Sequence, residues 1–125
     1  MWLNYLAVAA GGAIGCMARY GLTQFIQTLW GRNFPLATLT INVLGSFLLG
    51  FLFFATLERL TMAPALRTAI LTGGLGGFTT FSTFMVESML LVEDGYGGRA
   101  LLYVTLSVIL GFSAALAGGF LSRHI

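Results

Sequence analysis

The chain has 125 residues, of which 58% are hydrophobic and only 8% are charged, and its mean hydropathy is +0.93. Soluble domains carry about 25% charged residues, so this composition excludes a water-soluble domain and favours an integral membrane protein. Its six basic residues are all arginines and, with four acidic residues, give a net charge of +2. So little positive charge excludes nucleic acid as a partner, because nucleic-acid binding needs many phosphate contacts.

The motifs of common catalytic and metal sites are missing from the sequence. The one histidine, His124, is the next-to-last residue, the one cysteine is Cys16, and there is no lysine. A zinc site needs several His or Cys ligands, and a phosphate-binding loop needs a lysine after its glycines. We therefore predict that the chain is not an enzyme.

Four stretches are each long and apolar enough to cross a bilayer as a helix, which takes about 20 residues. They cover residues 4–29, 36–57, 64–92 and 99–121, and short polar connections join them. No basic residue precedes Arg19, so we interpret the first stretch as a retained span and not as a cleaved signal. The sequence predicts an all-α integral membrane protein, a single domain over residues 1–125 with four transmembrane helices.

The first and second stretches both place polar side chains inside an apolar segment. Arg19 lies deep in the first, where a guanidinium must reach the membrane interface, meet a partner or attract an ion. In the second, Thr38, Asn42 and Ser46 are spaced four apart and so share one helix stripe. The Asn42 carboxamide either joins two helices or meets a ligand, and the residues alone leave these readings open.

The third stretch contains four glycines at positions 73–77, near its middle. Each glycine costs a helix about 1 kcal/mol relative to alanine, so we expect the helix to break at these glycines, near the bilayer midplane. Freed carbonyls cannot face lipid and must be buried or line a cavity. The alternative is that Gly73 and Gly77 allow close packing of two helices, as small residues four apart often do.

Hydroxyl and phenyl groups alternate directly after these glycines. If a helix resumes there, Thr80, Thr83 and Glu87 share one face, and Phe81 and Phe84 lie on a neighbouring one. A phenyl ring has a positive edge, so ring edges and hydroxyls along one path can hold a small anion. The alternatives are that the two phenylalanines are ordinary core packing and that the Glu87 carboxyl is satisfied near the helix end. In the fourth stretch, Tyr103 and Ser107 continue such a polar stripe toward Gly111.

The loop arginines are almost balanced between the two sides of the membrane. Three would lie on the side of the N-terminus and two on the other: Arg59, Arg67 and Arg123 against Arg32 and Arg99. Orientation follows such differences, and one arginine gives little preference. We therefore expect insertion in both orientations and antiparallel pairing of two copies.

Two stretches of this sequence, residues 38–45 around Asn42 and residues 73–84 from the glycines to Phe84, resemble the CrcB/Fluc fluoride channels. The resemblance covers the whole chain in length, number of segments and order of motifs. It implies a dual-topology antiparallel homodimer in the plasma (inner) membrane. Two pores, each built from both subunits, would export fluoride passively and protect the cell from fluoride toxicity.

The resemblance also implies a role for particular residues. Asn42 would be an amide donor in the pore, Phe81 and Phe84 would meet fluoride with their ring edges, and the other pore residues would be Thr38, Ser82, Thr83, Glu87, Tyr103 and Ser107. Arg19 would belong to a positive vestibule. Backbone carbonyls of Gly76 and Thr79 from both subunits would hold a structural sodium ion. Gly111 departs from the family, because some members carry a serine there that continues the polar stripe.

Two other functions remain open from the residues. A small proton-coupled multidrug exporter also uses four short helices and antiparallel dimers, but it depends on a glutamate in its first helix, and this first stretch has no acidic residue. A non-conducting assembly subunit is favoured if the polar stripes only join helices, and an ion-flux measurement separates it from both transport functions.

Overall fold

A computed structural model describes residues 1–125 and is entirely helical. The helices are α1 (Trp2–Trp30), α2 (Leu36–Glu58), α3 (Pro64–Thr68), η1 (Ala69–Leu75), α4 (Gly76–Phe78), α5 (Phe81–Glu93) and α6 (Gly97–His124). Four spans are long and apolar enough to cross a membrane. The third, Pro64–Glu93, consists of α3, η1, α4 and α5 in succession. The predicted spans are confirmed to within three residues at every end.

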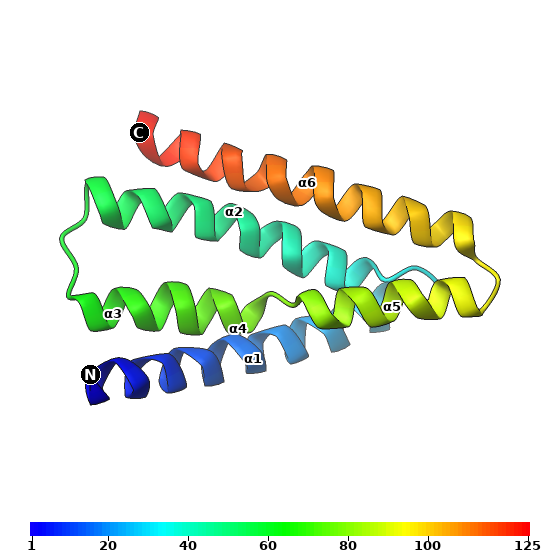
Figure 1. Ribbon diagram of the computed structural model, residues 1–125, viewed down its shortest axis with the longest axis horizontal. Helices are drawn as coiled ribbons and strands as arrows, with labels where there is room; N and C mark the ends of the chain where they lie inside the picture. The colour runs from blue at the N-terminus through cyan, green and yellow to red at the C-terminus, as the bar shows by residue number, and fades with distance from the viewer.

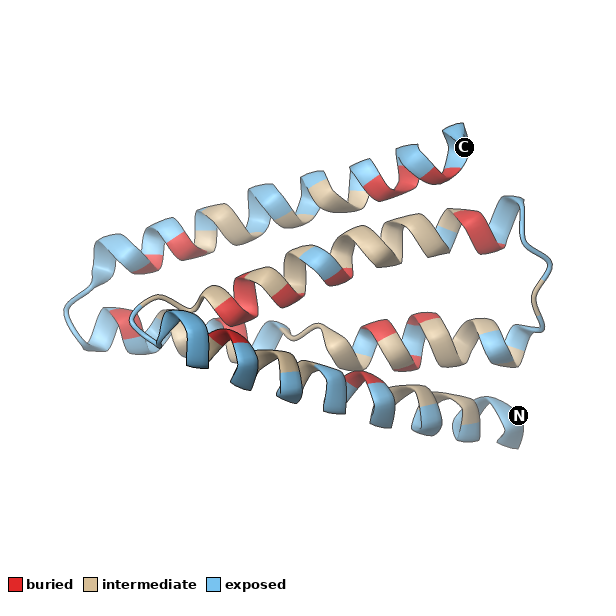
Figure 2. Cartoon of the chain, turned by 180° about the vertical axis from the view of Figure 1, so that it is seen from behind, coloured by how far each residue is buried: buried red, intermediate tan, exposed pale blue.

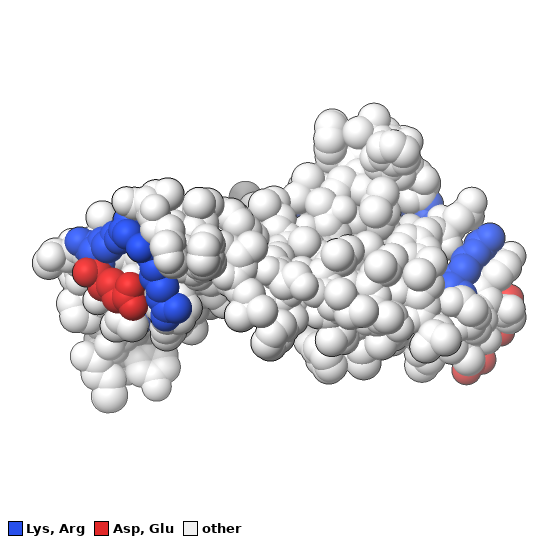
Figure 3. Space-filling view, turned by 90° about the horizontal axis from the view of Figure 1, so that it is seen from above, with Lys and Arg blue, Asp and Glu red and all other residues white.

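The four spans lie side by side, and both termini and the α2–α3 connection are at one end of the molecule (Figure 1). The α1–α2 and α5–α6 connections are at the other end. Charged side chains gather at the two ends and leave an uncharged surface between them (Figure 3). This distribution is that of a multi-pass membrane protein, since the hydrocarbon core disfavours charge and the interfaces accept it.

The single chain buries little of its own surface. Only 19 of 125 residues are buried, and they lie mainly on the inward faces of the helices (Figure 2). Large apolar side chains such as Phe81 and Phe112 are 71% and 68% exposed. Lipid or a further protein chain therefore has to cover most of this apolar surface.

The break in the third span is confirmed, but the expected position is wrong. The glycines stay helical, in the π-helical turns of η1 and in the short α4, whereas Thr79 and Thr80 are extended, with ψ angles of 159° and 122°. The glycines do not break the helix because a neighbouring helix packs on them. The break follows where the span leaves that neighbour.

That neighbour is α1, which contacts η1 through glycines on both helices. A Cβ atom at Gly15 would overlap the backbone oxygen of Gly74, and one at Gly73 would lie 2.8 Å from the Val8 oxygen. A Cβ at Gly77 would lie 3.0 Å from the Gly12 oxygen. The glycines therefore serve close packing, which was the alternative drawn from the sequence, and the break lies just beyond them.

The helices α2 and α6 run parallel and form the most extensive contact in the chain. Gly50 lies against the backbone of Ala115, and Gly118 against the backbone of Phe47, with no room for a Cβ atom at either glycine. Ser46 and Gly111 face each other one turn before Gly50 and Ala115. These contacts fix the register of the two helices.

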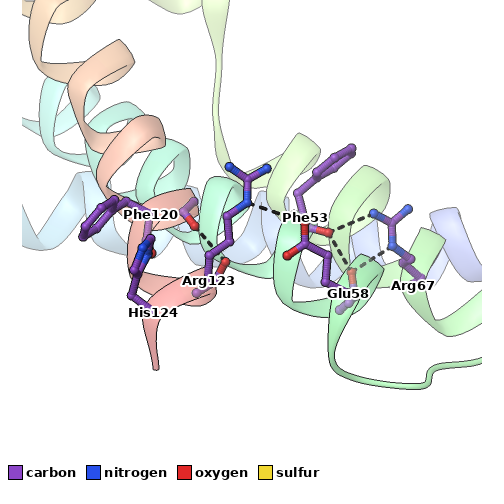
Figure 4. Close-up of polar contacts among 9 residues, drawn as sticks. Phe53, Glu58, Arg67, Phe120, Arg123 and His124 are labelled. Carbon is purple, nitrogen blue, oxygen red and sulfur yellow. Dashed lines mark hydrogen bonds and ion pairs between the residues drawn. The ribbon is translucent and has the colours of Figure 1, made fainter.

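Polar contacts hold together the end that carries both termini (Figure 4). The Arg67 guanidinium donates to the Thr56 hydroxyl at 2.8 Å and to the Phe53 carbonyl at 3.2 Å. Arg123 pairs with Glu58 at 3.5 Å and lies over the ring of Phe54. These cations lie near the carboxyl ends of α2 and α6, where the helix dipole favours positive charge.

Candidate functional site

The site is built around the extended residues between α4 and α5, because their backbone groups have left the helix. Asn42 on α2 satisfies both polar groups of Thr80: its amide nitrogen donates to the Thr80 carbonyl at 2.9 Å, and its amide oxygen accepts from the Thr80 nitrogen at 2.8 Å. In hydrocarbon each of those groups would otherwise lack a partner. The Asn42 side chain therefore joins α2 to the broken span.

This pairing leaves one donor of Asn42 unused. A carboxamide has two N–H groups, and only one of them is directed at Thr80. One N–H therefore holds the helices together, and the other has no partner in this chain.

Thr80 also begins the next helix. Its hydroxyl oxygen accepts from the Thr83 backbone nitrogen at 3.3 Å, and the Thr80 and Thr83 hydroxyls are 3.1 Å apart. A threonine at this position replaces a bond that the first turn of a helix lacks. Thr80 and Thr83 come together as expected, and their hydroxyls are adjacent to Asn42.

Carbonyls at the end of α4 and directly after it lose their usual helical partners. The Thr80 nitrogen donates to Asn42 and not to Gly76, and the Thr83 nitrogen donates to the Thr80 hydroxyl and not to Thr79. The Gly77 carbonyl accepts from the Arg19 guanidinium at 3.0 Å. No donor of this chain is bonded to the Gly76 or Thr79 carbonyl.

Arg19 is half-buried on α1 and reaches the break directly. Besides the Gly77 carbonyl, its guanidinium lies 3.8 Å from the sulfur of Cys16. This contact with a carbonyl is one of the outcomes expected for a deep guanidinium. Its positive charge is thereby placed beside the polar groups of the break.

A second polar cluster lies between α5 and α6. Tyr103 is fully buried, and its hydroxyl donates to the Glu87 carboxylate at 3.0 Å. The buried ring of Phe84 meets the Tyr103 ring edge to face, with centroids 5.0 Å apart at 86°. The register of α2 and α6 places Thr38 at the level of Tyr103, beside its hydroxyl.

The two predicted phenylalanines lie in different surroundings. Their rings contact each other edge to face, with centroids 5.9 Å apart, but Phe84 is 6% exposed and Phe81 is 71% exposed. Phe81 therefore points out of the single chain, as does Ser82. Any site that uses Phe81 has to be completed by a group outside this chain.

A cavity of about 440 Å³ opens at the end opposite the termini and reaches the second cluster. Glu87, Arg32, Arg99 and Asp94 are among the residues that line it. In the sequence, Arg32 and Arg99 bear only on the orientation of the chain in the membrane. Their place at this opening was not predicted, because it requires knowing that the two loops lie at the same end.

The polar residues thus follow one route, from the cavity past Glu87 and Tyr103 to Asn42, Thr80 and Thr83. Ser107 lies at the level of Asn42 in the α2–α6 register, and its hydroxyl oxygen is buried with no hydrogen-bond partner. Buried donors without a partner are rare in proteins, and each calls for a ligand or water. The Ser107 hydroxyl is therefore a donor that no other group of this chain uses.

Comparison with known proteins agrees with this geometry. Residues 6–119 match the family model of CrcB-like proteins, described as "CrcB-like protein, Camphor Resistance (CrcB)". The chain is 51% identical over 123 residues to the fluoride-specific ion channel FluC of Acidithiobacillus ferrooxidans, which covers 98% of both chains. It is 47% identical to FluC of Magnetococcus marinus, covering 94% of this chain and 96% of that protein. These relatives are named as ion channels, which confirms the prediction that the chain is not an enzyme.

Proposed function

Because the chain belongs to the CrcB family, we propose that it is a fluoride-selective channel that lets fluoride leave the cell passively and so protects the cell from fluoride toxicity. The observation that carries the proposal is the row of unused donors beside the break: the second N–H of Asn42 and the buried hydroxyl of Ser107. The family and the channel names of the relatives favour this function over a proton-coupled exporter.

The donors suit the chemistry of fluoride. Fluoride is small and strongly hydrated, so a pore that removes its water has to supply closely spaced hydrogen-bond donors. Amide and hydroxyl groups supply them along the route, and the edges of Phe81 and Phe84 add positive ring hydrogens. Glu87 accepts a hydrogen bond from the Tyr103 hydroxyl, and a passing fluoride ion would accept the hydrogen bond from that hydroxyl in its place.

The working unit is an antiparallel homodimer with two pores, each built from both subunits. The 71% exposure of Phe81 and the nearly balanced arginines of the two ends support this arrangement. A reporter fused to the C-terminus should read out on both sides of the membrane. A signal from one side alone would overturn the antiparallel pairing.

Fluoride efflux from liposomes tests the function. Liposomes that contain the purified protein in sodium buffer should release fluoride rapidly, as followed with a fluoride electrode, while chloride-loaded liposomes keep their chloride. Protein-free liposomes are the control. Fluoride that stays trapped although the protein is folded and dimeric would overturn the channel function, and proton-coupled uptake of a cationic dye would then test the exporter.

A structural sodium ion between the two subunits is part of the same proposal. The free carbonyls of Gly76 and Thr79 would hold it, two from each subunit, and its charge would lower the cost of an anion near the midplane. Protein purified and assayed with a large organic cation in place of sodium should lose fluoride efflux, and added sodium should restore it. Full efflux without sodium would overturn the sodium site and leave the channel function standing.

A further inference from the structure

Hydroxyl groups in this chain fall into two classes. Those of Thr28, Thr56 and Ser88 bond back to carbonyls of their own helix, four residues earlier. This is the usual way for a helical hydroxyl to satisfy itself. The hydroxyls of Ser46 and Ser107 make no such bond; the Ser107 oxygen is buried, and Ser46 is partly buried beside Gly111.

The register of α2 and α6 arranges these hydroxyls in levels one turn apart. Ser46 is level with Gly111. Counting back one turn on both helices pairs Asn42 with Ser107, and counting back two turns pairs Thr38 with Tyr103. At the levels of Thr38 and Asn42 both helices contribute a polar side chain. At the third, that of Ser46, α6 contributes none, because Gly111 has no side chain.

At that third level there is room beside Gly111, but the gap between α2 and α6 ends one turn further along. A Cβ atom built on Gly111 would have a single neighbour within 4 Å, the Ser46 hydroxyl oxygen at 3.9 Å. One turn later the backbones at Gly50 and Ala115 touch, and the helices leave no gap. Ser46 is therefore the last hydroxyl along this seam before it closes.

We propose that the Ser46 hydroxyl forms an additional binding position for the permeating anion at the level of Gly111, where it takes the place of a side chain that α6 does not supply. This inference rests on the proposed channel function. The free hydroxyl, the room beside Gly111 and the adjoining donors of Asn42 and Ser107 carry it. Fluoride moving along the seam would pass from Asn42 and Ser107 to Ser46, the last of these donors before the helices close.

A rescue experiment tests the position. Fluoride efflux is measured for the full-length protein, for Ser46→Ala, for Gly111→Ser, for the double variant, and for Ser113→Ala as a control on the exposed face of α6. Ser46→Ala removes the hydrogen bond from this hydroxyl to the anion. Because a hydrogen bond to a charged group is a strong one, we expect efflux to slow about tenfold. Gly111→Ser has room for its side chain, so the double variant should recover efflux to within about threefold of the unchanged protein.

Each outcome has one meaning. Slow efflux in Ser46→Ala with recovery in the double variant supports the position, and Ser113→Ala should match the unchanged protein. Efflux of Ser46→Ala at the unchanged rate, or a double variant no faster than Ser46→Ala although both elute as folded dimers, would overturn it. Unchanged protein that fails to release fluoride would instead overturn the proposed function, which separates the two failures.

Discussion

Replacing Asn42 by aspartate is expected to abolish most fluoride efflux while changing the side-chain volume very little. The variant loses the N–H that donates to the Thr80 carbonyl at 2.9 Å and turns a carboxylate oxygen toward that carbonyl. It also loses the second N–H and puts a negative charge on the route of an anion. Leaving a buried group unpaired costs about 1–3 kcal/mol, which alone predicts up to about a hundredfold loss of efflux.

The matched control for this change is Asn4→Asp, which makes the same chemical substitution at an exposed position of α1. Efflux rates are compared at equal protein density, and size-exclusion chromatography reports whether each variant remains a folded oligomer. Asn42→Asp that conducts as fast as Asn4→Asp would show that the amide neither holds the break nor contacts the ion.

Replacing Gly15 by alanine is expected to destabilise the protein strongly, although alanine is the better helix former. A Cβ atom there would overlap the Gly74 oxygen and lie 3.0 Å from the Phe78 nitrogen, so α1 and the third span have to move apart. Overpacking of this kind costs about 1–3 kcal/mol or more. The movement also displaces Arg19 from the Gly77 carbonyl and should lower efflux.

Gly21→Ala on the same helix is the control with the opposite expected sign. No atom lies within 4 Å of a Cβ at Gly21, so the gain in helix propensity, up to about 1 kcal/mol, is not opposed by any contact. Thermal unfolding of the detergent-solubilised protein should show a lower midpoint for Gly15→Ala and an equal or higher one for Gly21→Ala. Equal midpoints would mean that α1 and η1 are not packed as closely as described.

The four spans could be predicted from the sequence because hydropathy over about 20 residues is a local property. The position of the break could not. Glycine propensity indicated residues 73–77, but η1 packs against α1, and that contact keeps the glycines helical while Thr79 and Thr80 become extended. Tertiary contacts overrode propensity at this point, as they do elsewhere.

The candidate site was only partly predictable for a related reason. Periodicity placed Thr38, Asn42 and Ser46 on one stripe, which is correct, but it could not name the Thr80 backbone as the partner of Asn42. Nor could it show that Phe81 faces out of the chain while Phe84 is buried. The spacing of two phenylalanines on one helix does not reveal what packs against each of them. The roles of these residues in conduction remain predictions.

The hydrogen bonds at the break also bear on how the protein is made. The groups that satisfy the Thr80 backbone and the Gly77 carbonyl come from α2 and α1, which leave the ribosome before the third span does. Chains are synthesised from the N-terminus, and early segments can dock first. When the broken span enters the bilayer, α1 and α2 are already there. Its unpaired backbone groups can therefore be hydrogen-bonded before α6 is made. Nascent chains halted before α6 should thus already hold the third span in its broken form.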